Sequence, residues 1–452
     1  MSIIFFNQNK SIPSQVNEKA VNLMSILKNY IPRYNNKTNL FICLLALPLI
    51  TIPLPPLYNS IATILFLVLS FSGLYKLKLK INKTLLIPII LFGLMTLSLL
   101  WTSDLAFSLK GLQKNLPFLL IPLAFLFLPK FDKKILYSAI RLFGFSMVVF
   151  AIYSFIRATI RYVENGDKSM FLYNELVSVE LNAIYIATFT TVALFYFIIQ
   201  KNKKTLDYIA IYILALFVAL LYSKTVFLMV ALLLVWHYIQ FSKTQASVKW
   251  VTIALGVTFL FLSAIFVPQV QERVSEEYQT AFVDNTIYAN YGNKDQNIYN
   301  VSLKQAYTND DFKANSFFPG TAYRVFQARI FKEMLNEQKI WLTGFGINAS
   351  DKAIQEKHKQ YNLFNDYQYH NFHNQYIQFF SELGVIGFLV FLVMVFLNLK
   401  NAIKNKNFLH IAFAVSMIIL FLTESLLCRQ RGIVFFVTLY CIFNTIPHKQ
   451  EK

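Results

Sequence analysis

The chain has 452 residues, of which 56% are hydrophobic and only 14% are charged, and its formal net charge is +19 at pH 7. A soluble domain carries roughly 25% charged residues, so the composition excludes an ordinary soluble protein and predicts an all-α polytopic membrane protein. In a soluble protein such a charge would suggest a nucleic-acid partner. In a membrane protein it first indicates topology, and we expect membrane lipids and no nucleic acid as partners.

The N-terminal segment is polar and basic, and it has no apolar core followed by a small-residue cleavage site. We therefore expect no cleavable signal peptide and interpret residues 1–38 as a cytoplasmic tail. The three cysteines, Cys43, Cys428 and Cys441, all lie in apolar runs. This placement indicates neither a disulfide framework nor a cysteine-based metal site.

About twelve apolar segments follow, each close to the ~20 residues that a helix needs to cross a bilayer. Nine are predicted in 39–268 and three in 376–447, and the short C-terminus 448–452 follows them. One large polar segment, 269–375, separates the ninth span from the tenth. The predicted spans are 39–57, 60–75, 84–102, 115–129, 135–156, 178–200, 206–222, 225–241, 248–268, 376–399, 408–427 and 432–447.

Basic residues are concentrated in alternate connections between these spans, and the positive-inside rule assigns such connections to the cytoplasm. The rule places both termini on the cytoplasmic side as well. After nine crossings the polar segment 269–375 lies outside, which in a Gram-negative inner membrane means the periplasm. The basic connections are 76–83, 130–134, 201–204, 243–249 and 400–406.

Three cations occupy short predicted outer turns, where topology does not require them. Lys224 lies in LLYSKTVFL, and Arg429 and Arg431 lie in ESLLCRQRGIVFF. Either they serve a local function, or they reach lipid phosphates or pair with Glu424.

The polar segment contains one clear helical pattern, TAYRVFQARIFKEMLNEQ, directly after Pro319-Gly320. Arg324 and Arg329 lie about 140° apart around this helix, so they do not easily serve one small site together. The following WLTGFGIN, residues 341–348, contains two glycines that allow a tight turn. We assign no task to residues 269–318.

His373 and Asn374 stand where a polar, aromatic stretch becomes an apolar helix. The positive end of the helix dipole disfavours an imidazolium there, and a neutral imidazole suits a general base for a sugar hydroxyl. A histidine that merely caps the helix or packs against aromatic rings is the alternative. The planar fork of Arg324 and the point charge of Lys224 would suit a pyrophosphate.

Other site chemistries are less well supported by the sequence. His358, His370 and His373 share one loop, but no HExxH motif or well-spaced Cys or Asp set completes a metal shell. We see neither a phosphate-binding Gly-rich loop nor a glycosidase-like pair of carboxylates. We therefore expect no metal and no nucleotide cofactor.

Three segments resemble the O-antigen ligase and O-antigen polymerase superfamily of envelope glycosyltransferases. They are HNFHNQYIQFFSELGVIGF, TAYRVFQARIFKEMLNEQKIWLTGFGIN and LLYSKTVFLMVALLLV. WTSDLAFSLKGLQKNLPFLLIPL and TESLLCRQRGIVFF fit more weakly, and together the matches extend from about residue 98 to 446. The number of spans and the large loop after the ninth agree with the same family.

The resemblance implies a glycan donor on undecaprenyl pyrophosphate, an acceptor hydroxyl such as that of lipid A-core, and no metal. It implies that His373 takes the hydroxyl proton and that Arg324 holds the diphosphate. Lys224 stands where the family usually has arginine, which keeps the charge but loses the bidentate fork. The remaining candidate substrate-binding residues are Arg329, Arg429, Arg431 and Asn374.

Ligation is slightly favoured over polymerisation of repeat units, which uses the same donor. A lipid or anion transporter and a non-catalytic assembly partner are alternatives from other functional classes.

Overall fold

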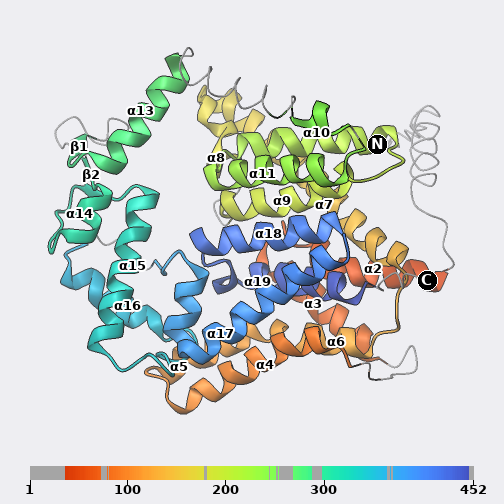
Figure 1. The fold of residues 1–452 in the computed structure, drawn as a ribbon, viewed down its shortest axis with the longest axis horizontal. Coiled ribbons are helices and arrows are strands. Elements are labelled where there is room, and N and C mark those ends of the chain that lie inside the picture. Colours follow the sequence, from red (N-terminus) through yellow and green to blue (C-terminus); the bar gives the residue numbers. More distant parts are fainter. Residues whose placement is uncertain are drawn as a thin grey trace, which may run out of the picture.

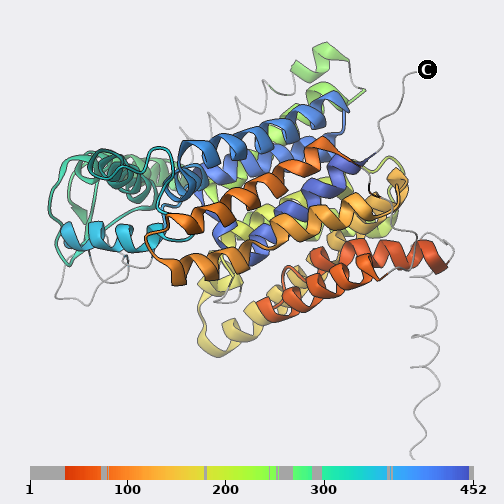
Figure 2. The same cartoon turned by 90° about the horizontal axis from the view of Figure 1, so that it is seen from below.

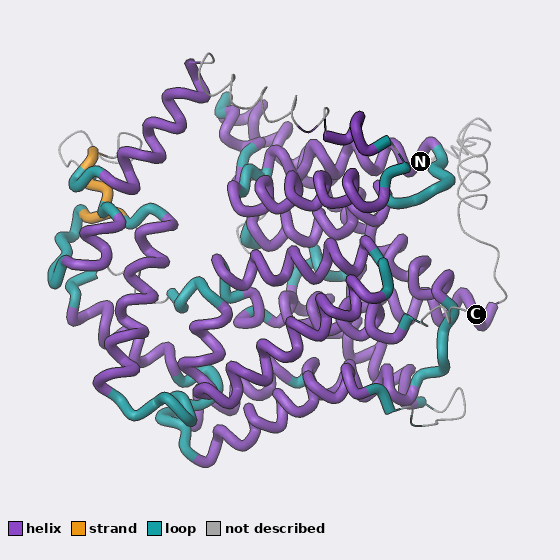
Figure 3. The backbone as a smooth tube through the Cα atoms, in the orientation of Figure 1, coloured by secondary structure: helices purple, strands orange, loops and turns teal. Residues whose placement is uncertain are grey.

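The structure is a computed structural model that describes residues 36–72, 79, 81–177, 181–243, 245–250, 253, 268–287, 298–363, 367 and 370–446. Over these residues the protein is mostly helical, and the short strands are confined to one region (Figure 3). The predicted all-α class agrees with this structure. The predicted ninth span, 248–268, lies largely outside the described residues, as do most of the tail 1–38 and the C-terminus 448–452.

A bundle of helices forms the larger part of the molecule (Figure 1). Each predicted span other than the ninth overlaps a helix of this bundle, with differing bounds. Among the described residues, four helical segments are long and apolar enough to cross a membrane: Lys83–Leu100, Lys133–Asn165, Lys224–Phe241 and Gln375–Lys404. The helices are α2 (Asn36–Ile50), α3 (Pro56–Phe71), α4 (Lys83–Leu97), α5 (Leu105–Asn115), α6 (Pro117–Phe127), α7 (Lys133–Asn165), α8 (Tyr173–Leu176), α9 (Ala183–Ile198), α10 (Thr205–Leu220), α11 (Lys224–Phe241), α17 (Gln375–Lys404), α18 (Phe408–Thr423) and α19 (Gln430–Thr445).

The centre of the bundle is formed by helices that are apolar on every side. In α19 every residue from Gly432 to Phe443 is buried, and in α9 every residue from Ile186 to Phe197 is buried. A helix without a polar face can only lie among other helices or in lipid, so these two are surrounded by their neighbours. Helices such as α3 and α11 instead expose large apolar side chains, for example Ile64 and Phe227.

Polar contacts define one end of the bundle. They join the start of α4 to the C-terminal ends of α17 and α19, and they join α7 to α10 and to Asn407 at the start of α18. The described basic residues Lys83, Lys133, Lys204 and Lys404 stand at these same helix ends, as expected if the end faces the cytoplasm. The contacts are Asn82–Asn444 (3.0 Å), Tyr137–Asn407 (2.8 Å) and Arg141–Asp207 (2.8 Å).

A separate polar unit, here called the loop domain, lies at the other end of the bundle (Figures 1 and 2). Its sheet has the order β1-β2-β3, in which β1 and β2 are antiparallel and β2 and β3 are parallel. The helix predicted after Pro319-Gly320 is α15, and it supplies much of a second hydrophobic core. The elements are α13 (Pro268–Phe282), β1 (Thr286–Ile287), β2 (Tyr299–Asn300), α14 (Leu303–Thr308), β3 (Ser316–Phe317), α15 (Gly320–Glu337) and α16 (Ser350–Gln360).

The glycine turn after α15 fastens the loop domain to α17. Gly344 and Gly346 both have positive φ, 68° and 99°, which confirms the predicted tight turn. Gly384 (φ 63°, ψ −167°) interrupts α17, and a Cβ there would lie 2.1 Å from the Leu342 carbonyl oxygen. At this kink Phe345 N–H donates to the Ser381 carbonyl at 2.8 Å. The contact fixes the start of α17 relative to α15, and both carry predicted site residues.

Candidate functional site

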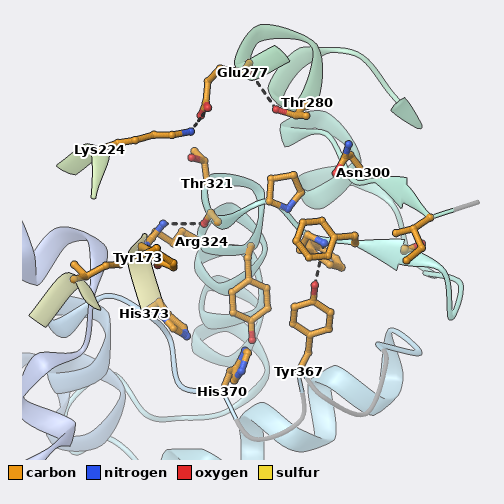
Figure 4. A pocket seen from close by; sticks show the side chains of 18 of the residues that line it. Tyr173, Lys224, Glu277, Thr280, Asn300, Thr321, Arg324, Tyr367, His370 and His373 are labelled. Carbon is orange, nitrogen blue, oxygen red and sulfur yellow. Dashed lines mark hydrogen bonds and ion pairs between the residues drawn. The ribbon is translucent and has the colours of Figure 1, made fainter. Parts of the chain in front are cut away.

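A cavity of about 1730 Å³ lies between the loop domain and the bundle. Three of the predicted residues stand on its surface: Lys224 of α11, Arg324 of α15 and His373 just before α17 (Figure 4). These residues are far apart in the sequence, so only the fold brings them together. The same cavity is also lined by Tyr173 and Glu424.

His373 is held in an unusual backbone conformation. Its φ is +49°, which side chains with a Cβ seldom adopt, and its N–H donates to Asn371 Oδ1 at 2.9 Å. The next residue, Asn374, is the N-cap of α17, so His373 precedes the helix as predicted. The ring packs edge-on against Tyr323 and His370, with centroids 5.6 and 5.5 Å apart. These contacts fix the ring at the cavity surface.

Glu424 joins two of the predicted residues. Its Oε2 lies 3.4 Å from His373 Nδ1, and its Oε1 accepts from Arg324 Nη2 at 2.8 Å. Glu424 is only 2% exposed, and it follows the last residue of α18. A carboxylate so deeply buried requires charged or hydrogen-bonding partners, and here each oxygen has one. The hydroxyl of Tyr185 also donates to Oε2, at 3.4 Å.

Arg324 uses part of its guanidinium to hold its position. Besides Glu424 it donates through Nε to the Thr423 carbonyl (2.7 Å) and through Nη1 to the Gly320 carbonyl (3.0 Å). Its side chain is 27% exposed, so the guanidinium is partly open to the cavity. A guanidinium has five N–H groups, and those not used within the protein can bind an anion.

Lys224 is the first residue of α11, after the N-cap Ser223. The positive end of a helix dipole disfavours a cation at this position. Lys224 pairs with Glu277 of α13, and both side chains line the cavity (Figure 4). Both side chains are more than half exposed, 62% and 52%. Exposed pairs contribute only ~0–1 kcal/mol, so an anionic ligand can replace Glu277 at little cost.

Tyr173 completes this side of the cavity. Burial, together with the nearby Glu424 carboxylate, raises its pKa, so the phenol stays protonated and can donate a hydrogen bond. Its backbone φ is +48°, and it begins the single turn α8.

Arg329 does not line the cavity, although the sequence proposed it as a substrate-binding residue. It pairs with Asp310 at 2.7 Å and Glu333 at 3.0 Å, and its guanidinium lies 4.8 Å from the ring centre of Tyr361. The angle between Arg324 and Arg329 around α15 explains the difference, because it directs Arg329 toward α14 and α16. Its contacts hold the loop domain together.

The other three proposed binding residues also lie outside the cavity lining. Asn374 caps α17, since its Oδ1 accepts from Tyr376 N–H and Ile377 N–H at 3.0 and 3.1 Å. Arg429 is the N-cap residue of α19, and Arg431 lies in its first turn. Glu424, which the sequence allowed as a partner for these two arginines, pairs with Arg324 and His373.

Part of the cavity surface comes from the stretch 269–318, to which the sequence assigned no task. Tyr299 and Asn300 of β2 and Phe317 of β3 line it, together with Asn315. Aromatic rings and amides beside a cavity suit a hydroxyl-rich ligand, because rings cover its C–H faces and amides bond its hydroxyls. The high Asn and Tyr content of residues 269–318 was the only signal in the sequence for this part of the cavity surface.

Residues 209–392 match the family described as O-antigen ligase. The matched range contains Lys224, Arg324 and His373, whereas Glu424 lies beyond it. The resemblance noted from three short segments is thereby confirmed. None of the curated proteins compared with the chain matches it.

Proposed function

We propose that this member of the O-antigen ligase and polymerase superfamily is an integral membrane glycosyltransferase. It moves a glycan from undecaprenyl pyrophosphate to an acceptor hydroxyl, such as that of lipid A-core, at the outer face of the inner membrane. The observation that carries this proposal is the convergence of Lys224, Arg324 and His373 on one cavity. The basic helix ends at the opposite end of the bundle support the orientation.

In the proposed reaction, His373 removes the proton of the acceptor hydroxyl through Nε2. The hydroxyl oxygen attacks the anomeric carbon on the face opposite the diphosphate. As that bond forms, the bond from the anomeric carbon to the phosphate oxygen breaks, and its electron pair leaves with the polyprenyl diphosphate. The proton remains on the imidazole until the product departs.

Lys224 and Arg324 would stabilise the charge that develops on the leaving diphosphate. Cations placed in advance act on the transition state without further reorganisation, and this term is often the largest in enzyme catalysis. The two cations differ in the exposure of the carboxylates that pair with them. Glu277 is exposed and can give way to the diphosphate, whereas buried Glu424 stays with Arg324.

The test is transfer by the purified protein in lipid vesicles that contain an undecaprenyl-diphosphate glycan and a lipid acceptor. We expect His373→Ala to abolish transfer without changing the amount or orientation of the protein. His237→Ala is the control, because His237 packs against Phe408 in the bundle and does not line the cavity. If His373→Ala retained transfer, the proposed base would be excluded.

Repeat-unit polymerisation has the same donor chemistry and differs only in the acceptor. We favour ligation because the His-Asn segment and the Ser-Lys turn resemble that branch. Envelope glycans from a deletion strain distinguish the two activities. Accumulation of long polyprenyl-linked chains supports a ligase, and accumulation of single repeat units supports a polymerase.

A further inference from the structure

Glu424 has a position that the proposed catalytic roles do not explain. It stands at the end of α18 and contacts α15 through Arg324 and the start of α17 through His373. The chain around it is fastened to α17 as well. Ser425 Oγ accepts from Asn374 N–H at 3.1 Å, and Gln375 Oε1 accepts from Leu427 N–H at 2.7 Å. The carboxylate therefore belongs to a segment that is fixed relative to His373.

We infer that Glu424 is a positioning residue, which sets the tautomer of His373 and the orientation of Arg324. This inference rests on the proposed function. A carboxylate beside Nδ1 favours the tautomer that carries its proton on Nδ1. Nε2 then has the free lone pair, and it is the atom that can accept the proton of the sugar hydroxyl. A second carboxylate oxygen holds Arg324, so one side chain aligns the base with the cation for the leaving group.

The same contact supports the step after proton transfer. Once Nε2 has taken the proton, the ring carries a positive charge at a fixed distance from a buried carboxylate. The low local dielectric strengthens this attraction relative to an exposed pair. A purely structural link between α15 and α18 would need only the Arg324 contacts. The approach of Oε2 to the ring indicates the additional role.

The test compares Glu424→Gln and Glu424→Asp in the vesicle assay. The glutamine variant keeps the size of the side chain but offers one acceptor oxygen and no charge. We expect kcat to fall at least about 100-fold while KM for the donor changes no more than about threefold, the pattern for loss of a group that acts in the transition state. The aspartate variant keeps the charge and should restore part of kcat. Glu175→Gln is the matched control, because it removes an exposed carboxylate that pairs with Arg161 outside the cavity lining.

The outcomes separate this inference from the proposed function. Loss of transfer in His373→Ala, with unchanged kcat in correctly folded Glu424→Gln, would overturn the role of Glu424 and leave the proposed function intact. A lower yield of folded Glu424→Gln with normal kcat per folded molecule would assign the residue a structural role and also overturn the inference. Retained transfer in His373→Ala would overturn the proposed base, and with it the positioning role.

Discussion

The two sides of the cavity carry the same kind of ion pair in different surroundings. Arg324–Glu424 is a buried pair, with the carboxylate 2% exposed, and two backbone carbonyls fix the guanidinium. Lys224–Glu277 is an exposed pair between the first residue of α11 and the interior of α13. Burial of the partner carboxylate therefore decides what each cation can do. The buried pair holds a fixed geometry, and the exposed pair can exchange its carboxylate for a ligand.

Removal of Arg324 should have the largest effect, because it leaves Glu424 buried without its main partner. Breaking a buried pair in this way costs about 3 kcal/mol or more. For Arg324→Ala we expect transfer to fall at least about 100-fold through loss of a preplaced cation. The loop domain should also become more sensitive to protease. Arg161→Ala, which breaks the partly exposed pair with Glu175, should change neither property appreciably. Normal transfer by Arg324→Ala would remove this residue from the site.

The helical fold was largely predictable from the sequence, since a membrane requires long apolar runs and these are visible one by one. The helix α15 was also predictable, from its apolar spacing after Pro319-Gly320. The kink in α17 was not. The run from Gln375 to Lys404 is continuous in its apolar pattern, and only backbone pairing with the distant glycine turn reveals the role of Gly384.

The candidate site was predictable only in part, and Glu424 shows why. Sequence proximity suggested Arg429 or Arg431 as its partner, whereas the structure pairs it with Arg324, which lies 100 residues away. No local pattern encodes a contact between distant segments. Arg329 shows the converse. Its separation from Arg324 around the helix predicted different surroundings, and the structure directs it into the loop domain.

His358 differs from His373, which stands at the cavity surface, because it lies in a buried environment. His358 is fully buried in the loop domain and contacts Gln327 at 2.9 Å. Burial lowers the pKa of His358 to about 4, from an ordinary histidine value of about 6.5. Between these values the unfolded chain binds a proton that the folded domain does not bind, so stability should fall as pH drops from about 6.5 to 4. Hydrogen exchange in α16 measures this loss, and His358→Gln should flatten the pH dependence. An unchanged slope in that variant would assign the dependence to other groups.

Substitutions of Lys224 test whether the exposed cation binds diphosphate. We expect Lys224→Ala to raise KM for the donor about tenfold, equivalent to ~1.4 kcal/mol of lost binding. Lys224→Arg keeps the charge and adds a fork, so it should retain or improve transfer. Lys110→Ala, an exposed lysine on α5 outside the cavity lining, is the control. Equal activity in wild type, alanine and arginine forms would exclude Lys224 from the site.

Neutralisation of Glu277 should have the smallest effect. It should lower KM for the donor, whereas Lys224→Ala should raise it. Glu277→Gln removes the carboxylate that competes with a diphosphate for Lys224. Because an exposed pair is worth ~0–1 kcal/mol, KM for the donor should fall by a factor of about 5 or less while kcat and stability stay nearly constant. High salt screens exposed charges, so the difference between the variant and the wild type should shrink as ionic strength rises. Glu276→Gln, its neighbour on α13, is the control that keeps the Lys224 pair. A higher KM in Glu277→Gln would mean that Glu277 holds Lys224 in its binding position, and the exposed pair would then resemble the buried one.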